Sequence, residues 1–331
     1  MAEQNLVEVR GLKKWFPVQK GFIERLVTRQ RQFVHAVDGV DFDIRRGEVF
    51  GLAGESGSGK TTTGRLILRL VEPTAGSVLF DGVDLAALSL EEVRRTRKRM
   101  QVIFQDPFAS LNPRMKCGEG IGHSLEIFRV ARKDEKRSQV LEMMERVGLT
   151  PARVLYDKYP HQLSGGQRQR AVIARALVLH PDLIVADEPI AMADVSVRAL
   201  LLDLMVQLKQ DFNLTYLFIT HDLATAKYIC DRIAIMYLGL ICELGTLEQV
   251  YRHPQHPYTQ ALLAAVPVPD PHARRTAALP KGEIPSPITP PPGCRFHPRC
   301  PGATEICSQE LPPLRPVPGA EGHLVACHSM R

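Results

Sequence analysis

The sequence has no long uninterrupted apolar run. Its most apolar stretch, residues 182–195, is broken by carboxylate side chains, so no segment reaches the roughly 18 apolar residues of a membrane span. The N-terminus carries acidic residues and lacks the apolar segment of a secretory signal. We therefore expect a cytosolic chain that depends on other chains to span the membrane if it works at one.

The chain also lacks the composition of a disordered protein. Of its 331 residues, 44% are hydrophobic and 24% are charged, which suits one large α/β domain with an appendage. The net charge of +6 is scattered except for the run Arg94–Arg99, which we place at the end of a helix. We interpret this charge as an ordinary basic surface. The seven cysteines are not expected to pair as disulfides, because the cytosol keeps thiols reduced.

Short apolar runs alternate with helical patterns along most of the chain. The runs occupy residues 49–54, 100–105, 182–187, 214–220 and 232–239. Continuous apolar strands between helices are typical of a parallel sheet that is covered on both faces. We therefore predict an α/β domain over residues 1–253.

Two regions depart from this alternation. Residues from about Gly118 to Leu163 are rich in helical patterns and contain no apolar strand, so we predict a helical subdomain at about 116–180. After residue 253 prolines become frequent, which excludes long helices and favours turns and extended segments. We predict a separate Pro/Cys-rich C-terminal extension over residues 254–331.

A phosphate-binding motif lies between the first apolar run and a helix. The sequence GESGSGKT at 54–61 matches the pattern G-x-x-x-x-G-K-S/T. In such a loop the backbone N–H groups point at phosphates, Lys60 neutralises them, and the Thr61 hydroxyl binds Mg²⁺. The helix N-terminus adds its partial positive charge. The predicted nucleotide-binding residues here are Gly54, Glu55, Ser56, Gly57, Ser58, Gly59, Lys60, Thr61 and Thr62.

A second motif is an apolar strand that ends in two carboxylates, Asp187 and Glu188. The carboxyl end of such a strand lies where open α/β sheets bind their ligands. We expect Asp187 to hold Mg²⁺ and Glu188 to polarise the attacking water. The alternative is that these acids merely cap the next helix. We consider it weaker, because the phosphate-binding motif and the strand with two acids occur in the same chain in this order.

A third motif is LSGGQ at 163–167, directly before a helical pattern. In this order the three motifs resemble the ABC ATPase family over about Val7–Gly245. The resemblance implies an ABC-type nucleotide-binding domain with a mostly parallel sheet core, an antiparallel β part and a helical subdomain. It also implies a head-to-tail dimer in which the motif contacts the γ-phosphate on the other chain, through Ser164, Gly165, Gly166 and Gln167. A Ser-Gly-Gly turn at a helix N-terminus is physically suited to an anion.

Further roles follow from the resemblance alone. Gln105 corresponds to a glutamine that contacts Mg²⁺ and the attacking water, and His221 to a histidine at the γ-phosphate. Phe16 corresponds to an aromatic residue that stacks on adenine, although anchoring of the first strand is nearly as good an explanation. After Glu188 the family usually has Ser-Ala-Leu-Asp, whereas residues 191–194 read AMAD. That departure puts communication between the two ATP sites, or the turnover of one of them, in question.

The C-terminal sequence narrows the resemblance. HPYTQALL at 256–263, PPGCRFHPRCP at 291–301 and the basic segment 20–31 resemble ATPase subunits of bacterial dipeptide and oligopeptide importers, of the F type. The resemblance implies a related second ATPase subunit, two integral membrane permease subunits and, indirectly, an external peptide-binding protein. It places the chain peripherally at the cytoplasmic face of the inner membrane. Nickel importers share this layout, so the cargo stays open.

Four cysteines of the extension form a candidate metal site, namely Cys294, Cys300, Cys307 and Cys327. Four thiolates can hold Zn²⁺ or an iron–sulfur cluster. No C-x-x-C pair is present, which counts against a zinc ribbon. The resemblance implies a 4Fe–4S cluster, and four unligated thiols are the remaining alternative. The other three cysteines are interpreted as ordinary core or surface residues.

Two alternatives of another class stay open. An ABC ATPase that acts on nucleic acid would use the basic surface to contact phosphates, but the chain has a single ATPase unit and no basic patch interleaved with aromatics. We therefore expect no nucleic-acid partner. A regulatory ATP binder with little turnover would fit the altered residues 191–193. We favour hydrolysis, because Lys60, Asp187, Glu188 and His221 are all present.

Overall fold

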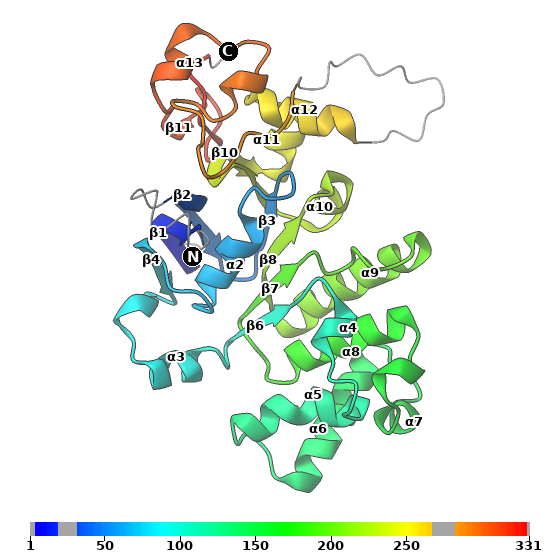
Figure 1. Ribbon diagram of the computed structural model, residues 1–331. Helices are drawn as coiled ribbons and strands as arrows, with labels where there is room; N and C mark the ends of the chain where they lie inside the picture. The colour runs from blue at the N-terminus through cyan, green and yellow to red at the C-terminus, as the bar shows by residue number, and fades with distance from the viewer. Residues whose placement is uncertain (1–3, 19–31, 267–281, 330–331) are drawn as a thin grey trace, which may run out of the picture. The chain divides into compact units, whose positions relative to one another are not determined.

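The computed structural model describes residues 4–18, 32–266 and 282–329 (Figure 1). The chain divides into two compact units. Unit 1 contains Arg45–Val49 and Ala87–Ile219, together with Gln4. Unit 2 contains the described residues of Asn5–Ile44, Phe50–Ala86 and Thr220–Arg331.

Three parallel strands form the sheet of unit 1, in the order β6, β7, β8. They are β6 (Met100–Ile103), β7 (Leu183–Asp187) and β8 (Thr215–Thr220, whose last residue belongs to unit 2). Val185 pairs with Val102 on one side and with Leu217 on the other. Strands β7 and β8 are buried along almost their whole length, as expected for strands that are covered on both faces. Asp187 is the last residue of β7 and therefore lies at the carboxyl edge of this sheet.

Helices make up the rest of unit 1. Between β6 and β7, helices α5 to α8 pack on one another, with Ile121, Val140 and Met144 fully buried among them. This is the helix-rich sequence noted above (Figure 1). The helical elements are α3 (Leu90–Thr96), α4 (Pro107–Ser110), α5 (Cys117–Ile127), α6 (Lys133–Arg146), α7 (Ala152–Tyr156), η2 (Pro160–Gln162), α8 (Gly165–Leu177) and α9 (Val195–Phe212).

Unit 2 contains the predicted antiparallel part. Its strands run in the order β2, β1, β4, β5, and the β1–β4 and β4–β5 pairs are antiparallel. Their bounds are β1 (Asn5–Pro17), β2 (Phe33–Arg45), β4 (Ala75–Phe80) and β5 (Val83–Asp84). Trp15 at the end of β1 donates its indole N–H to Asp38 of β2 over 2.8 Å, so this aromatic residue anchors the first strand.

A second, mixed sheet in unit 2 runs in the order β11, β12, β10, β9, β3. Only the β3–β9 pair is parallel, and the other pairs are antiparallel. The strands are β3 (Val49–Ala53), β9 (Arg232–Tyr237), β10 (Leu240–Thr246), β11 (Arg315–Pro316) and β12 (Leu324–Val325). Because β12 pairs with β10, the C-terminal region adds strands to this sheet.

The helices of unit 2 are short. Those after residue 254 have at most nine residues, in keeping with the proline content, and α12 begins at Pro257, where a missing N–H costs nothing. The helical elements are α2 (Lys60–Ile67), η1 (Leu85–Ala87), α10 (Leu223–Ile229), α11 (Leu247–Arg252), α12 (Pro257–Ala265), η3 (His297–Arg299) and α13 (Glu305–Gln309).

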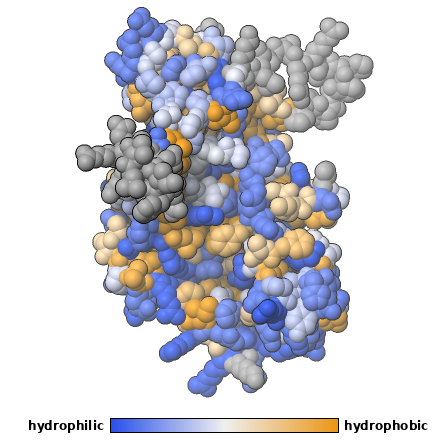
Figure 2. All heavy atoms as spheres, viewed as in Figure 1, coloured by the Kyte–Doolittle hydropathy of each residue, from blue (hydrophilic) through white to orange (hydrophobic). Residues whose placement is uncertain are grey.

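No helix in the described ranges combines the length and the apolar character needed to cross a membrane. The longest of the elements above, α9, spans 18 residues and contains four charged side chains. Hydrophilic residues cover much of the face seen in Figure 2, with smaller hydrophobic areas between them.

A buried carboxylate joins the C-terminal region to the sheet of unit 2. Glu243 of β10 is fully buried, and its Oε1 lies 2.8 Å from the backbone N of Gln255 and 2.8 Å from Nε2 of His323. Its Oε2 accepts a hydrogen bond of 2.9 Å from the backbone N–H of His256. One side chain of β10 therefore contacts two backbone N–H groups at the start of α12 and a histidine just before β12.

Replacement of this carboxylate should destabilise unit 2. In Glu243→Gln an amide N–H₂ faces groups that donate, so we expect the free energy of unfolding to fall by about 3–5 kcal/mol, as when one partner of a buried charged network is removed. Urea denaturation followed by circular dichroism measures the change. Glu248→Gln is the control, because that side chain is 71% exposed and its removal should change stability by less than about 1 kcal/mol. Equal stability of the two variants would contradict the prediction.

Candidate nucleotide-binding site

The loop at 54–61 is shaped by close backbone approach. Gly54 has φ +151°, and a Cβ there would lie 2.1 Å from the carbonyl oxygen of Met236. Gly59 has φ +108°, and a Cβ there would lie 2.2 Å from the carbonyl oxygen of Ala36. Only glycine fits at either position. The loop backbone thus packs closely against β9 and β2 of the same unit, and the loop leads directly into α2.

Lys60 is the first residue of α2 and is 6% exposed. Its ammonium group donates to the carbonyl oxygens of Gly54 and Glu55, each over 2.8 Å, and lies 3.3 Å from the Ser58 hydroxyl. The side chain therefore curls back over the loop and places a positive charge inside it. Ser56 and Gly57, at the tip, are exposed. A buried cation within a ring of backbone groups is an arrangement that binds phosphate.

Unit 1 brings two of the predicted catalytic side chains together. Gln105, which follows β6, donates from Nε2 to Oε2 of Glu188 over 2.8 Å. Glu188 follows β7 directly and has φ +48°, a conformation that non-glycine residues seldom adopt. Its backbone N–H donates to the carbonyl of Ile219 in β8 over 2.9 Å. The strand edge holds this unusual backbone and so aims the carboxylate toward Gln105, beside Asp187.

Gln169 contacts the segment that follows Glu188, and the sequence motifs did not predict this contact. It is buried on α8, two residues beyond the LSGGQ motif, and its amide donates to the carbonyl of Pro189. This bond ties the helix that follows the motif to the segment just after Glu188. A lone glutamine on an amphipathic helix carries no sequence signal of such a contact.

The LSGGQ motif forms the start of α8. Ser164 is the N-cap: its hydroxyl accepts from the backbone N–H of Gln167 over 3.2 Å, and the Gln167 side chain accepts from the Ser164 N–H over 3.0 Å. Both Ser164 and Gly165 are exposed. This capping box leaves the positive end of the helix dipole at the surface of unit 1, where an anion can approach it.

The remaining predicted residues have different settings. Phe16 is the penultimate residue of β1, is 36% exposed, and lies with its ring 5.1 Å from the Lys14 ammonium. His221 is exposed and follows β8, next to Asp222, the N-cap of α10. Asp187 and Thr61 are partly exposed. Each unit thus presents a part of the predicted set at its surface.

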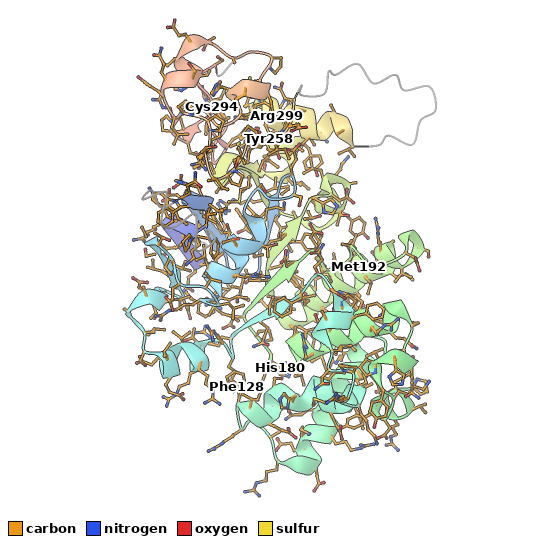
Figure 3. The ribbon with its side chains drawn as sticks, in the orientation of Figure 1. Phe128, His180, Met192, Tyr258, Cys294 and Arg299 are labelled. Carbon is orange, nitrogen blue, oxygen red and sulfur yellow. The ribbon has the colours of Figure 1, made fainter. Side chains whose placement is uncertain are left out.

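The segment 191–193 precedes α9. Met192 is 63% exposed (Figure 3), and Ala193 uses its carbonyl to accept from Nε of Arg198 over 2.9 Å. Asp194 is the N-cap position of α9 but makes no side-chain capping bond. The residues that depart from the expected Ser-Ala-Leu therefore lie on the surface of unit 1 and not in its core.

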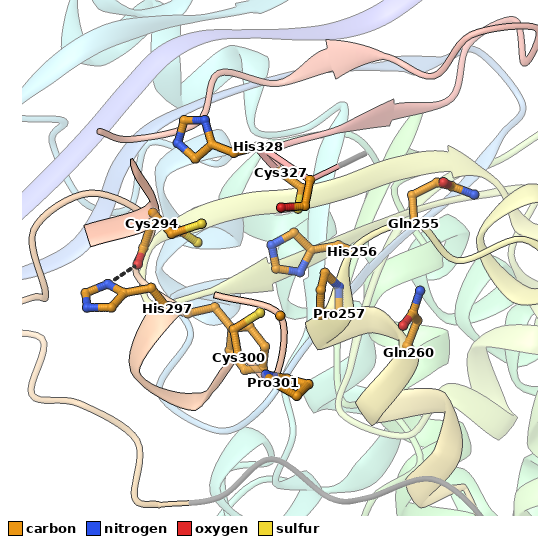
Figure 4. Close-up of a pocket in the computed structure, with 14 residues that line it drawn as sticks. Gln255, His256, Pro257, Gln260, Cys294, His297, Cys300, Pro301, Cys327 and His328 are labelled. Atoms are coloured by element: carbon orange, nitrogen blue, oxygen red, sulfur yellow. Dashed lines mark hydrogen bonds between the residues drawn. The ribbon is translucent and has the colours of Figure 1, made fainter. Parts of the chain in front are cut away.

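The four cysteines of the C-terminal region line one cavity of about 520 Å³ (Figure 4). His256, Phe296 and His297 also contribute to its wall. The backbone N–H of Cys294 donates to the carbonyl of Cys307 over 2.8 Å, which brings two of the thiol-bearing segments together. Residues that lie up to 33 positions apart in the sequence therefore share this cavity, namely Cys294, Cys300, Cys307 and Cys327.

Burial changes the pKa of three of the thiols. It raises the pKa of Cys294 to about 11, and it also raises the pKa values of Cys300 and Cys327. Within the described ranges, no three His, Cys, Asp or Glu side chains are arranged to hold one metal ion. The thiols thus surround a space and do not converge on a point. The other cysteines, Cys117, Cys230 and Cys242, are buried in the core.

Two parts of the chain match known families. Residues 37–191 match the family model described as ABC transporter, and residues 242–307 match the model described as oligopeptide/dipeptide transporter, C-terminal region. A peptide import ATP-binding protein of Brucella ovis is 50% identical over 327 residues, with 99% of this chain and 98% of that protein covered. The chain belongs to the ABC transporter family.

Other relatives of this ABC protein extend over its whole length. The oligopeptide transport ATP-binding protein AppF of Bacillus subtilis is 46% identical, covering 98% of each chain. The dipeptide transport ATP-binding protein DppF of Haemophilus influenzae is 47% identical, covering 97% of this chain and 96% of that protein. The predicted resemblance to the ABC ATPases with this C-terminal region is therefore confirmed.

Solved structures agree on the fold. A dimer of the ATP-binding cassette MJ0796 in a post-hydrolysis state, with ADP and phosphate bound, superimposes with a TM-score of 0.63 at 28% identity and covers 73% of this chain and 98% of its own. The protein cbiO1 of Clostridium perfringens gives a TM-score of 0.64 at 26% identity, covering 76% and 92%. This ABC protein is an ATPase, and its family implies ATP and Mg²⁺ as ligands.

The cap of α8 can be tested by itself. Ser164→Ala removes the hydroxyl that accepts from Gln167, so we expect the free energy of unfolding to fall by about 1 kcal/mol. Ser164→Thr keeps a hydroxyl at the N-cap and should retain most of the stability. Urea denaturation of the two variants beside the parent measures the difference, and an equal loss in both would show that the capping bond is not responsible.

Proposed function

We propose that this ABC ATPase drives the import of dipeptides or oligopeptides through partner membrane subunits. The observation that carries the proposal is the similarity of 45–50% to proteins named for peptide transport over the full chain, C-terminal region included. Nickel import, the alternative from the sequence, has no such support among these names. The ATPase is placed peripherally at the cytoplasmic face of the inner membrane.

The ATP site is assigned as follows. Residues 54–62 bind the phosphates, with Lys60 as the counter-charge, and Phe16 stacks on adenine. The burial of Lys60 within the loop supports this role, since a desolvated ammonium interacts more strongly with an anion than an exposed one. Thr61 and Asp187, with Gln105, would hold Mg²⁺, which spreads the charge of the phosphates. The domain bounds proposed are 1–253 and 254–331, with the helical subdomain at about 116–180.

Hydrolysis is assigned to Glu188, with Gln105 and His221 beside the γ-phosphate. The carboxylate of Glu188 orients and polarises a water, whose oxygen attacks the γ-phosphorus while the bond to the β–γ bridging oxygen breaks and ADP leaves. The bond from Gln105 to Glu188 supports the pairing, because it already places an amide at the carboxylate. Catalysis of this kind is mostly positioning and charge neutralisation.

The working form is a head-to-tail dimer with a related second ATPase subunit. Ser164, Gly165, Gly166 and Gln167 of each subunit complete the phosphate site of the other. Support comes from the exposed N-terminus of α8 and from the dimeric state of the similar cassette MJ0796. Two permease subunits carry the cargo, an external binding protein delivers it, and no nucleic acid takes part.

The role of Glu188 can be tested with Glu188→Gln. The amide cannot polarise water as a carboxylate does, so we expect phosphate release, with the companion ATPase subunit present, to fall by at least about 100-fold. ATP binding should persist, and light scattering with saturating Mg-ATP should show the closed dimer accumulating. Glu142→Gln on α6 is a matched control, because that side chain is 69% exposed.

Two results would contradict these assignments separately. Unchanged phosphate release from Glu188→Gln would remove Glu188 as the residue that activates water. A strictly monomeric Glu188→Gln protein, with its companion and saturating Mg-ATP present, would contradict the dimer in which each subunit completes the other's site.

The four-cysteine cavity is proposed to hold a 4Fe–4S cluster. A single Zn²⁺ needs four ligands at about 2.3 Å from one point, and the thiols line a cavity instead. A cluster is held at four separate irons, which suits cysteines spread around a space. The cluster would supply a redox-active or structural centre, held by Cys294, Cys300, Cys307 and Cys327.

Iron and acid-labile sulfide analysis of anaerobically purified protein tests this site. We expect about four iron and about four sulfide per chain. The Cys307→Ser variant should lose both the iron and the sulfide. Cys230→Ser, at another buried cysteine, should keep them. One zinc per chain without iron would favour the zinc alternative, and neither metal would leave four free thiols.

A further inference from the structure

The C-terminal region contacts the phosphate loop directly. Arg299, in η3, donates from Nη1 to Oε2 of Glu55 over 2.9 Å and from Nη2 to Oε1 over 3.2 Å. Glu55 is the second residue of the phosphate loop. Nη1 of Arg299 also lies 3.3 Å from the hydroxyl of Tyr237. Two parallel N–H···O bonds of this kind fix the carboxylate in orientation as well as in place.

A second contact from the same region restrains the backbone of Glu55. The Glu55 N–H donates to the hydroxyl of Tyr258 in α12 over 2.9 Å. Tyr258 is fully buried, and its ring lies 4.6 Å from that of Tyr237 and 5.3 Å from that of Phe296. Packing of the ring therefore fixes the hydroxyl. Arg299 and Tyr258 lie close together above the strands of the mixed sheet (Figure 3).

The two contacts extend through Glu55 to Lys60 of the phosphate loop. The carbonyl of Glu55, on the far side of the residue, accepts from the Lys60 ammonium over 2.8 Å and from the Ser58 N–H over 3.2 Å. Glu55 is thus held by its side chain, its N–H and its C=O at once. The position of its carbonyl, and with it the path of Lys60, depends on two residues more than 200 positions further along the chain.

Stability of the fold is a poor explanation for the ion pair. The Arg299 side chain is 8% exposed, and its Nε is buried with no hydrogen-bond partner in the part of the chain that the structure describes. The free energy lost by desolvating a guanidinium that has an unsatisfied N–H offsets much of the free energy gained from the ion pair. Such a pair is better suited to specifying a geometry than to adding stability.

We propose that Arg299 and Tyr258 are positioning residues for the phosphate loop, through which the C-terminal region sets the affinity for ATP. The inference rests on the proposed function, in which this loop binds ATP. A loop that is already ordered pays less conformational entropy when the phosphates arrive. Arg299 directly precedes Cys300, which lines the four-cysteine cavity, so a change in that cavity lies one residue from the ion pair.

The test compares ATP affinity with turnover in the full chain and its companion subunit. For Arg299→Ala we expect the Kd for ATP, measured by titration with a fluorescent ATP analogue, to rise about 10-fold, with KM following and kcat changing less than about 2-fold. Arg299→Lys keeps the charge but loses the paired geometry, so its Kd for ATP should lie between that of the parent and that of Arg299→Ala. Tyr258→Phe, which keeps the ring and loses the hydroxyl, should raise Kd about 3-fold.

A double-mutant cycle separates positioning from general support of the C-terminal region. If Arg299 acts through Glu55, Arg299→Ala should change Kd by less than about 2-fold in a Glu55→Ala background. If it only attaches the C-terminal region, its effect should persist in that background and be accompanied by a lower Tm. Arg315→Ala is the control, because it removes an exposed guanidinium from the same region without touching the loop.

The outcomes distinguish this inference from the proposed function. A parent protein that bound no ATP would contradict the proposed function itself. A parent that binds ATP, with unchanged Kd in Arg299→Ala and Tyr258→Phe, would overturn the positioning role alone. If Arg299→Ala fails to fold, Arg299→Lys and Tyr258→Phe at parental Tm decide: raised Kd supports the role and unchanged Kd overturns it.

Discussion

The phosphate loop depends on backbone packed against backbone. Gly54 and Gly59 lie so close to carbonyl oxygens of β9 and of β2 that any Cβ would displace the loop from the sheet. This contact holds the loop between strand and helix, and the Lys60 side chain folds back onto the carbonyl oxygens of Gly54 and Glu55. The position of the Lys60 ammonium group therefore depends on glycine, which has no Cβ, at both residue 54 and residue 59.

The catalytic edge of unit 1 uses a different constraint. Glu188 adopts a backbone conformation that costs free energy, and the bond from its N–H to β8 compensates part of that cost. The result is a carboxylate aimed at Gln105 and a following segment tied to α8 through Gln169. Helix α8 begins directly after Ser164 of the LSGGQ motif, so the Gln169 bond connects this helix to the segment that follows Glu188.

Much of the fold and of the candidate site could be predicted because the signals are local in the sequence. The strands β3, β7 and β8 are mostly apolar and buried, and the loop and the two carboxylates lie at the ends of β3 and β7, where a few residues show both the chemistry and the spacing. The pairing of β12 with β10, and the contact of His323 with Glu243, could not be predicted, because short strands and single polar residues far along the chain carry no pattern.

The C-terminal region illustrates the same limit and its consequence. Composition separated it from the ATPase domain, since prolines and cysteines interrupt the α/β pattern, yet its side chains complete the surroundings of the phosphate loop. Arg299 and Glu55 lie 244 residues apart, and neither residue type is unusual in its own segment. In a loop whose motif specifies only glycines, lysine and a hydroxyl residue, Glu55 occupies a variable position. At such a position a contact from another region can change how well the loop is ordered. The residues of the phosphate-binding motif itself can then stay the same.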